Sequence, residues 1–290
     1  MPFNEKSRLD PSQVQDRRGM RTGTKVALGG GGLSLIILVA ALLLGVNPGE
    51  LLNVSELAPS TYDPYAGEIS DLATECQTGA DANTRQDCAI VGYVNSIQAY
   101  WSDVFASQGV EYVPAQTVLF SGATEAACGY AYGAMGPFYC PYDQMVYLDL
   151  DFFDELLARF GAEGGPFAEA YILAHEYSHH VQDLLGILEP GGQGPQSMSV
   201  YTELQADCMA GVWVSHAVET GYLLQVTDQE IAQSLDAAAS VGDDLIQRQT
   251  QGYVSPETWT HGSSEQRYSA LLDGIQTGDI NTCETPGWTE

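Results

Sequence analysis

Residues 171–180 read YILAHEYSHH and contain the pattern His-Glu-x-x-His. His175 and His179 stand four residues apart, so an α-helix places both imidazoles on one face, within reach of a single metal ion. Glu176 follows the first histidine and lies about 100° further round the same helix. The pattern therefore predicts a helix at this position, with a metal site on one of its faces.

These three residues have the chemistry of a catalytic zinc site. Two imidazoles suit zinc, and a third protein ligand would leave the fourth coordination position open for water. The metal would lower the pKa of that water, and Glu176 would take its proton and pass it to the leaving amine. The alternative is a pair of ordinary hydrogen-bonded histidines at the edge of a core, so the zinc hypothesis requires a third ligand elsewhere in the chain.

A candidate for the third ligand lies on the next apolar helix, which the sequence predicts at residues 198–221. Glu203 and Asp207 stand four residues apart on one face of this helix. The chain between His179 and Glu203 is long enough to turn back once, so this helix can run antiparallel to the motif helix. A carboxylate at Glu203 would complete a His, His, Glu zinc site, and Asp207 would accept the free ring N–H of a ligating histidine. The alternative is that both acids face solvent, although an unused acidic pair on an apolar helix costs desolvation.

The chain is strongly acidic, with a formal net charge of -28 and a pI of about 4.1. Such a surface repels phosphates, so we expect no nucleic acid partner. Six of the ten basic residues lie within residues 1–25, which leaves four arginines among the acids of the remaining chain. The simplest explanation of the acidic excess is a highly solvated surface rather than a dedicated basic partner.

The six cysteines all follow the apolar segment described below, and their even number indicates disulfides in an oxidising compartment. A cysteine zinc site is the alternative, but the chain has no C-x-x-C pair. Many pairings are compatible with the sequence. Proximity along the chain favours Cys76–Cys88 and Cys128–Cys140, which leaves Cys208–Cys283.

Residues 26–46 form an uncharged apolar stretch that is long enough, at about 31 Å as a helix, to cross the core of a bilayer. Basic residues precede it, so we expect residues 1–25 to be a disordered cytoplasmic tail and the C-terminal domain to lie outside. A cleaved signal peptide is the alternative, but residues 45–49 match a small-x-small cleavage site poorly. Residues 47–66 contain several prolines and are predicted to be a linker to a domain of residues 67–290.

The pattern of residues 67–290 predicts an α+β domain that is predominantly helical and carries a small sheet. Extended segments are expected at residues 110–120 and 144–150, and the glycine-rich stretch 128–141 suits a constrained loop or hairpin. Neither His180 nor His216 stands at a ligand offset from the motif, and His180 lies off the face of the motif histidines, so both are expected to be structural. Besides the helix at residues 198–221, helical spacing of apolar residues predicts helices at residues 86–107, 151–160, 166–188, 228–249 and 263–272.

Taken together, the motifs resemble those of a known family, the bacterial neutral zinc metallopeptidases, which are membrane-anchored relatives of the thermolysin-like zincins. The resemblance covers nearly the whole chain and rests on MPFNEKSRLDPSQVQDRRG, GPFYCPYDQMVYLDLDFF, HEYSHHVQ, ELQADCMAG and THGSSEQR. It implies a zincin fold, one catalytic Zn²⁺ per chain and peptide hydrolysis. It also implies His175, His179 and Glu203 as the metal ligands and Glu176 as the acid and base.

The segment THGSSEQR adds His261 and Arg267 to the candidate site. In zincins a cationic or donor side chain often stabilises the developing oxyanion opposite the zinc. His261 would fill that role, with Arg267 as oxyanion or structural support; the alternative is a helix start whose arginine pairs with one of the many acids. Zincins also pair an extended substrate with an edge strand, which we expect around Tyr147, unless Tyr139 and Tyr147 are core or rim residues.

The sequence therefore predicts a single-pass membrane protein whose outer domain is a zinc metallopeptidase, an endopeptidase acting on peptides or proteins. Two alternatives come from other classes. A catalytically inactive zincin would bind zinc and act as an adaptor in the cell envelope, but it has no need of Glu176. An ordinary acidic structural domain would require both the histidine pair and the carboxylate pair to be accidental. The natural substrate and the oligomeric state are left open.

Overall fold

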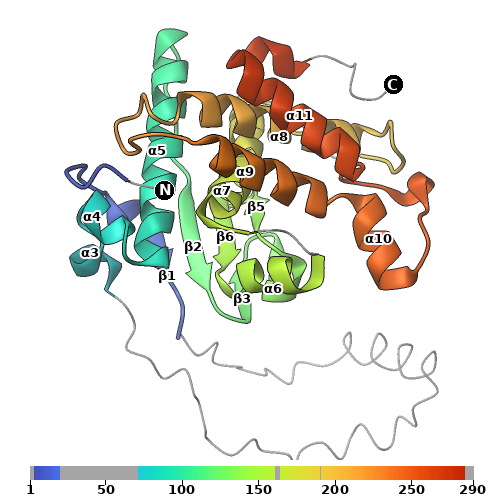
Figure 1. Ribbon diagram of the computed structural model, residues 1–290, viewed down its shortest axis with the longest axis horizontal. Coiled ribbons are helices and arrows are strands. Elements are labelled where there is room, and N and C mark those ends of the chain that lie inside the picture. The colour runs from blue at the N-terminus through green and yellow to red at the C-terminus, as the bar shows by residue number, and fades with distance from the viewer. Residues whose placement is uncertain (1–2, 20–70, 161–163, 190, 285–290) are drawn as a thin grey trace, which may run out of the picture. The chain divides into compact units, whose positions relative to one another are not determined.

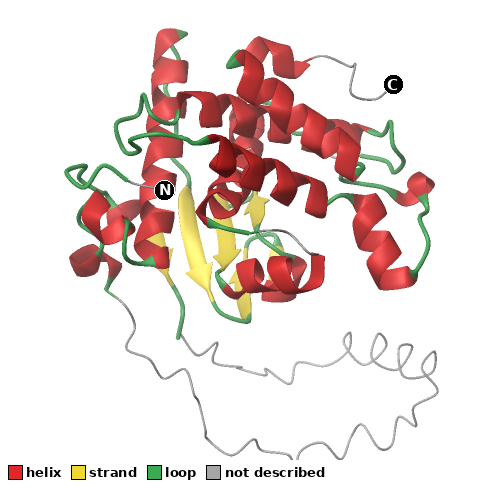
Figure 2. Ribbon diagram, in the orientation of Figure 1, coloured by secondary structure: helices red, strands yellow, loops and turns green. Residues whose placement is uncertain are grey.

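A computed structural model of the chain describes residues 3–19, 71–160, 164–189 and 191–284. These residues form an α+β unit in which helices outnumber strands (Figures 1 and 2), and this confirms the predicted fold class. The predicted transmembrane segment, residues 26–46, and the predicted linker, residues 47–66, lie outside the described residues. Within the part of the chain that is described, no helix combines the length and the apolar character needed to cross a membrane.

The main sheet has the strand order β1-β2-β6-β5, drawn in yellow in Figure 2. Strands β1 and β6 run parallel to the central β2, whereas β5 runs antiparallel to β6 and ends the sheet. Both β2 and β6 are rich in buried apolar residues, as strands covered on both faces are. The bounds are β1 Val14–Asp16, β2 Gln116–Phe120, β5 Phe138–Cys140 and β6 Met145–Asp149.

A separate hairpin lies between β2 and β5. Strand β3, Ala123–Ala126, pairs antiparallel with β4, Gly129–Tyr132. The glycine-rich stretch between Cys128 and Cys140 therefore does not form a hairpin by itself, because β4 pairs with β3, β5 pairs with β6, and a 3-10 helix, Gly133–Met135, joins β4 to β5. The two disulfides favoured by proximity, Cys76–Cys88 and Cys128–Cys140, are present, and so is the remaining pair, Cys208–Cys283.

The helices fall close to their predicted bounds, with one exception. The segment predicted as one helix at residues 228–249 is two helices, because Gly242 interrupts it where the chain meets the start of α11. A Cβ at Gly242 would lie 2.2 Å from the backbone nitrogen of Ser264, so this approach requires glycine. The helices are α3 Leu72–Glu75, α4 Gly79–Ala82, α5 Gln86–Ser107, α6 Asp151–Phe160, α7 Pro166–Leu185, α8 Met198–His216, α9 Asp228–Ser240, α10 Asp243–Gln251 and α11 Ser264–Thr277.

Helix α8 packs against both α7 and α11, and this arrangement positions the candidate site. The crossing of α8 and α11 is so close that glycine is needed on both sides. A Cβ at Gly211 would lie 2.2 Å from the carbonyl oxygen of Leu271, and one at Gly274 would lie 2.0 Å from that of Cys208. The disulfide between Cys208 and Cys283 ties the end of the described chain to the same helix.

The prediction of a disordered N-terminal tail is wrong for residues 3–19, which pack on the domain (blue in Figure 1). Phe3 is 1% exposed, and its ring lies 4.9 Å from that of Tyr93 on α5. Leu9 and Val14 are also buried, and Val14 begins β1. The irregular spacing of these three apolar residues gives no periodic signal, so composition alone suggested disorder although each side chain enters the core.

We expect Phe3→Ala to destabilise the whole domain, because it removes a buried ring and leaves a cavity at α5. Losses of about 3–5 kcal/mol are typical of such truncations. Urea unfolding followed by fluorescence measures the change, with Tyr142→Ala as the control, since Tyr142 is 82% exposed. Equal unfolding midpoints for the two variants would mean that the N-terminal residues do not contribute to the core.

Candidate metal site and catalytic cleft

Helix α7 carries the histidine motif and is firmly held at both ends. Pro166 occupies its first turn, where a missing N–H costs nothing, and Gly186 ends it in the left-handed conformation. Most of its residues are buried, including His175 at 7% and Glu176 at 8% exposure. The rings of His175 and His179 lie 4.7 Å apart and nearly perpendicular, so both face the same space in front of the helix.

Glu203 reaches this space from α8. Its carboxylate oxygens lie 3.1 Å from Nε2 of His175 and 3.5 Å from Nε2 of His179. One ligand atom from each of the three residues falls within 4.8 Å of the others. Burial alone would raise the pKa of Glu203, but the adjacent imidazoles lower it well below its usual range, so the carboxylate is ionised.

Asp207, one turn beyond Glu203 on α8, fixes the orientation of His175. Its Oδ1 lies 2.8 Å from Nδ1 of His175 and accepts a hydrogen bond of 2.6 Å from the hydroxyl of Tyr171. Since an ionised carboxylate only accepts, Nδ1 of His175 donates to Asp207 and Nε2 donates to Glu203. Burial would lower the pKa of His175, but Asp207 and Glu203 raise it to about 10. A metal held by Nε2 would take the place of the proton that faces Glu203.

Arg267 from α11 neutralises Asp207. Its Nε and Nη2 donate to the two carboxylate oxygens at 2.8 and 2.9 Å, and Nη2 also donates to Tyr171 at 3.2 Å. Asp207 is fully buried and Arg267 is 4% exposed. Burial would raise the pKa of Asp207, but the charges of Arg267 and His175 hold it at about 2. The ion pair thus places a fixed anion behind the first histidine.

The second histidine has its own support, which sequence reasoning missed. Nδ1 of His179 lies 2.8 Å from Oε1 of Gln182, one turn further along α7. The amide nitrogen of Gln182 donates to the carbonyl of Thr202 and to Gln205 on α8, so Oε1 is the atom left to accept from His179. The position of Gln182 three residues after His179 was the available signal, since such residues are neighbours on a helix.

A cleft of about 450 Å³ opens over the cluster. Glu176 lines it together with the three clustered side chains, whereas apolar groups from the loop before β5 and from α6 and α10 form much of its wall. Glu176 therefore borders the same cleft as the histidines and Glu203. The cleft is large enough for part of an extended peptide. Its apolar lining includes Met135, Pro137, Phe138, Phe152, Ile172 and Ile246.

His261 also lines this cleft. Its side chain is half exposed, and its Nδ1 lies 3.2 Å from Oδ1 of Asp243 at the start of α10. The other oxygen of Asp243 accepts from the backbone N–H groups of Thr260, His261 and Gly262. The hydrogen bond with Asp243 raises the pKa of His261 against the effect of its partial burial. Asp243, the partner of His261, was not predicted from the sequence.

The remaining candidates have structural surroundings. Nε2 of His180 lies 2.7 Å from the carbonyl of Val113, and Nε2 of His216 lies 3.0 Å from that of Gly278. Tyr147 is in the core on β6, which lies between β2 and β5. The edge strand expected around Tyr147 is instead β5, which contains Tyr139, because a short antiparallel strand covers that side of β6.

The fold and the cluster define a class of α+β proteins in which a histidine pair on one helix meets a carboxylate from the next at the floor of a cleft. The chain belongs to the family described as putative neutral zinc metallopeptidase, whose model matches residues 3–286. The match includes the N-terminal residues that pack on the domain.

Two curated relatives extend this comparison. The uncharacterized protein Rv2575 of Mycobacterium tuberculosis strain H37Rv is 48% identical over 84% of each chain. The uncharacterized protein YpfJ of Escherichia coli strain K12 is 36% identical over 97% of each chain. No solved structure matches this chain.

We expect Gln182→Ala to weaken zinc binding by about 10–100-fold, because partners behind a ligating histidine have effects of this size. The affinity can be measured by competition with a chromophoric chelator. Gln108→Ala is the control, since Gln108 is an exposed residue at the end of α5. An unchanged affinity in Gln182→Ala would mean that His179 needs no help to reach the metal.

Proposed function

We propose that this protein is a zinc-dependent peptidase that hydrolyses peptide bonds in its cleft. One observation carries the proposal: atoms of His175, His179 and Glu203 lie within 4.8 Å of one another, in a cleft that Glu176 also lines. Membership of a family described as zinc metallopeptidases supports the same reaction.

The three side chains fit a zinc ion on geometric grounds. Zinc bonds of about 2.0–2.1 Å in a tetrahedron separate neighbouring ligand atoms by about 3.3 Å. The contacts of Glu203 with the two histidines, 3.1 and 3.5 Å, bracket that value. Two neutral imidazoles and one carboxylate leave a fourth position for substrate or water. A zinc ion held here would act as a Lewis acid on the peptide carbonyl and would lower the pKa of the attacking water.

The chain's own residues would move the protons and stabilise charge. Glu176 would accept the proton of the attacking water and deliver it to the leaving amine, since it shares the cleft with the ligands. His261, which also lines the cleft, would donate to the oxyanion, because its raised pKa favours the protonated ring. Asp243 would hold that ring in place, as its contacts with three successive backbone N–H groups fix the loop.

The substrate would bind as an extended strand. Strand β5 ends the described sheet, and Phe138 and Tyr139 on it line the cleft. A peptide that added to this edge would use main-chain hydrogen bonds for affinity and side-chain pockets for specificity. The apolar walls of the cleft favour an apolar residue close to the cleaved bond.

We propose further that the apolar stretch of residues 26–46 holds the enzyme at a membrane, since it is uncharged and long enough to enter a bilayer. Hydrolysis itself does not depend on this attachment, because every residue proposed as a metal ligand or as a proton donor or acceptor lies between residues 175 and 261. The adaptor alternative is weaker, because a binding protein does not need a carboxylate such as Glu176 beside the metal ligands.

Glu176→Gln tests the reaction directly. We expect the variant to keep about one zinc per chain, because Glu176 is not a ligand, and to lose at least about 100-fold in peptidase activity, the usual contribution of a general base. Metal analysis and cleavage of a proteome-derived peptide library measure the two properties. Glu111→Gln is the control, since Glu111 is exposed. Unchanged cleavage by Glu176→Gln would reject the proposed mechanism.

The pH profile tests the donor role of His261. The donating form is the protonated ring, so activity should fall as the pH rises through the raised pKa of His261. Asp243→Asn removes the negative partner and lowers that pKa, so the alkaline limb should move to lower pH. Asp244→Asn is the matched control, because Asp244 bonds Ser264 rather than His261. An alkaline limb that stays in place would assign it to another group.

A further inference from the structure

The surface under the N-terminal residues is built to hold a main chain. We call residues 3–18 the N-terminal arm. Asn83 accepts from the backbone N–H of Phe3 at 2.8 Å and donates to its carbonyl at 3.1 Å. Asn95, which is 1% exposed, accepts from the N–H of Asp10 at 2.7 Å and donates to its carbonyl at 3.0 Å. Each asparagine thus uses both ends of its amide on one residue of the arm, as in the recognition of a peptide.

The packing under the arm is equally specific. A Cβ at Gly92 would lie 2.4 Å from the ring of Phe3, and one at Gly79 would lie 2.0 Å from the carbonyl oxygen of Asn4. Gln98, which is 4% exposed, donates to the side chain of Gln13 at 2.8 Å. Without the arm, buried amides would lose their partners and the groove over Gly92 would be empty. The domain therefore requires the arm for its own polar groups to be satisfied.

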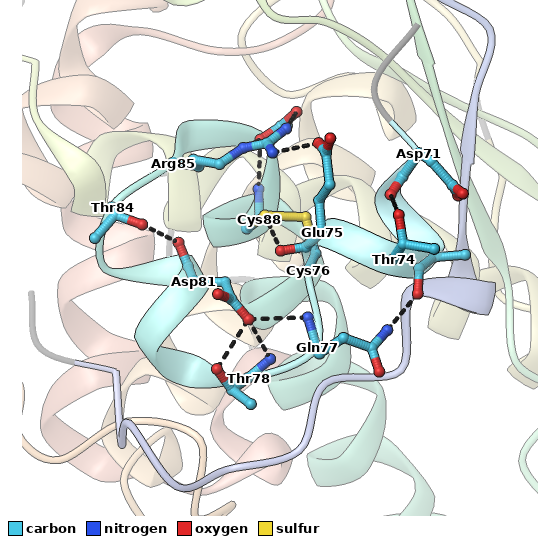
Figure 3. Close-up of a disulfide and its surroundings, with 12 residues drawn as sticks. Asp71, Thr74, Glu75, Cys76, Gln77, Thr78, Asp81, Thr84, Arg85 and Cys88 are labelled. Atoms are coloured by element: carbon cyan, nitrogen blue, oxygen red, sulfur yellow. Dashed lines mark hydrogen bonds and ion pairs between the residues drawn. A yellow bond between two sulfur atoms is a disulfide. The ribbon is translucent and has the colours of Figure 1, made fainter.

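The arm also crosses the part of the domain that Figure 3 shows. The disulfide between Cys76 and Cys88 joins α3 to α5, and Arg85 forms an ion pair with Glu75 beside it. These links fix the turn at Gln77, whose carbonyl accepts from the N–H of Leu9 at 3.0 Å. The disulfide thus stabilises the receptor surface, by which we mean the surface of the domain under the arm, on the side where the arm begins.

The other end of the arm completes the main sheet next to the motif helix. Strand β1 pairs in parallel with β2, with Val14 opposite Thr117. Thr117 is fully buried, and its hydroxyl lies 2.9 Å from that of Tyr177, which belongs to the histidine motif on α7. The arm therefore supports the strand that contacts the motif helix.

Two basic residues of the arm, Arg17 and Arg18, also contact the domain. Arg18 pairs with Asp16 at 2.6 Å and with the buried Asp87 at 2.9 Å. The backbone N–H of Arg17 donates to the carbonyl of Leu119 at 2.8 Å, and its guanidinium lies 5.9 Å from the centre of the Tyr147 ring. These charges were part of the reason to place the N-terminus in the cytoplasm, yet they bind the domain.

We propose that the arm is a constant part of the catalytic domain and that both lie on the same side of any membrane. A single crossing by the chain between them would put the arm and its receptor surface in different compartments. Cleavage after the apolar stretch would remove the arm altogether. This orientation replaces the one expected from the sequence, in which the N-terminus is inside and the domain outside. In the proposed orientation, the chain leaves the arm and returns to the domain on the same side of the membrane.

Labelling of full-length protein in cells tests this orientation. Lys6 on the arm and Gln108 on α5 are both exposed, and all six native cysteines are in disulfides. Lys6→Cys and Gln108→Cys, made separately, are treated with a membrane-impermeant maleimide in intact cells and with a second maleimide after lysis. We expect the same ratio of the two labels at both positions. Label from opposite sides would overturn the proposal.

A second measurement tests docking in the same full-length chain. The side chains of Gln15 and Gln116 are hydrogen bonded across β1 and β2. The double variant Gln15→Cys, Gln116→Cys should form a link within one chain under a short bismaleimide, seen as a mass change of the intact protein, whereas neither single variant should. Reactive but unlinked cysteines would show that the arm is undocked and would overturn the proposal. Because neither test measures hydrolysis, their outcome is independent of the proposed activity.

Discussion

The candidate site depends on one buried carboxylate. Asp207 accepts hydrogen bonds from His175 and Tyr171 on α7 and pairs with Arg267 on α11, so it joins three helices at a single point. An isolated buried charge would be costly, and the guanidinium makes it tolerable. The consequence is that Asp207 holds Nδ1 of His175, so that Nε2 of the same ring faces Glu203. The helices that carry Asp207 and Arg267 also cross closely, with Gly211 on α8 and Gly274 on α11 at the points of nearest approach.

The local part of this arrangement could be predicted from the sequence. The spacing of His175, His179, Glu203 and Asp207 along two helices follows from helical periodicity, and the helix bounds were close to those of the structure. The partners contributed by distant segments could not be predicted in the same way. Asp243 lies beside His261 only because Gly242 breaks a helix, and nothing in local periodicity indicates where that break brings the chain.

The fold of the N-terminal residues could not be predicted from their own sequence. Their composition resembles that of a disordered tail, because segments with few apolar residues and many charges seldom fold alone. They are ordered because the domain holds them in place. Two asparagines of the domain bond their backbone, and two glycines of the domain leave room for them. The residues that order the arm belong to the domain, so the sequence of the arm itself does not reveal that it is ordered. The edge strand was misplaced for a related reason, since strand order depends on pairing rather than on residue pattern.

The location of Arg267 on α11, after α7 and α8 in the chain, has a consequence for biosynthesis. The ligands on α7 and α8 are made first, but the guanidinium that neutralises Asp207 arrives only with α11. While the ribosome is still adding α11, the anion behind His175 has no counter-charge and α8 has no glycine-lined partner. The nascent protein should therefore be unable to assemble its cleft before α11 has been made. Assembly of the cleft is thus linked to the folding of α11 onto α8.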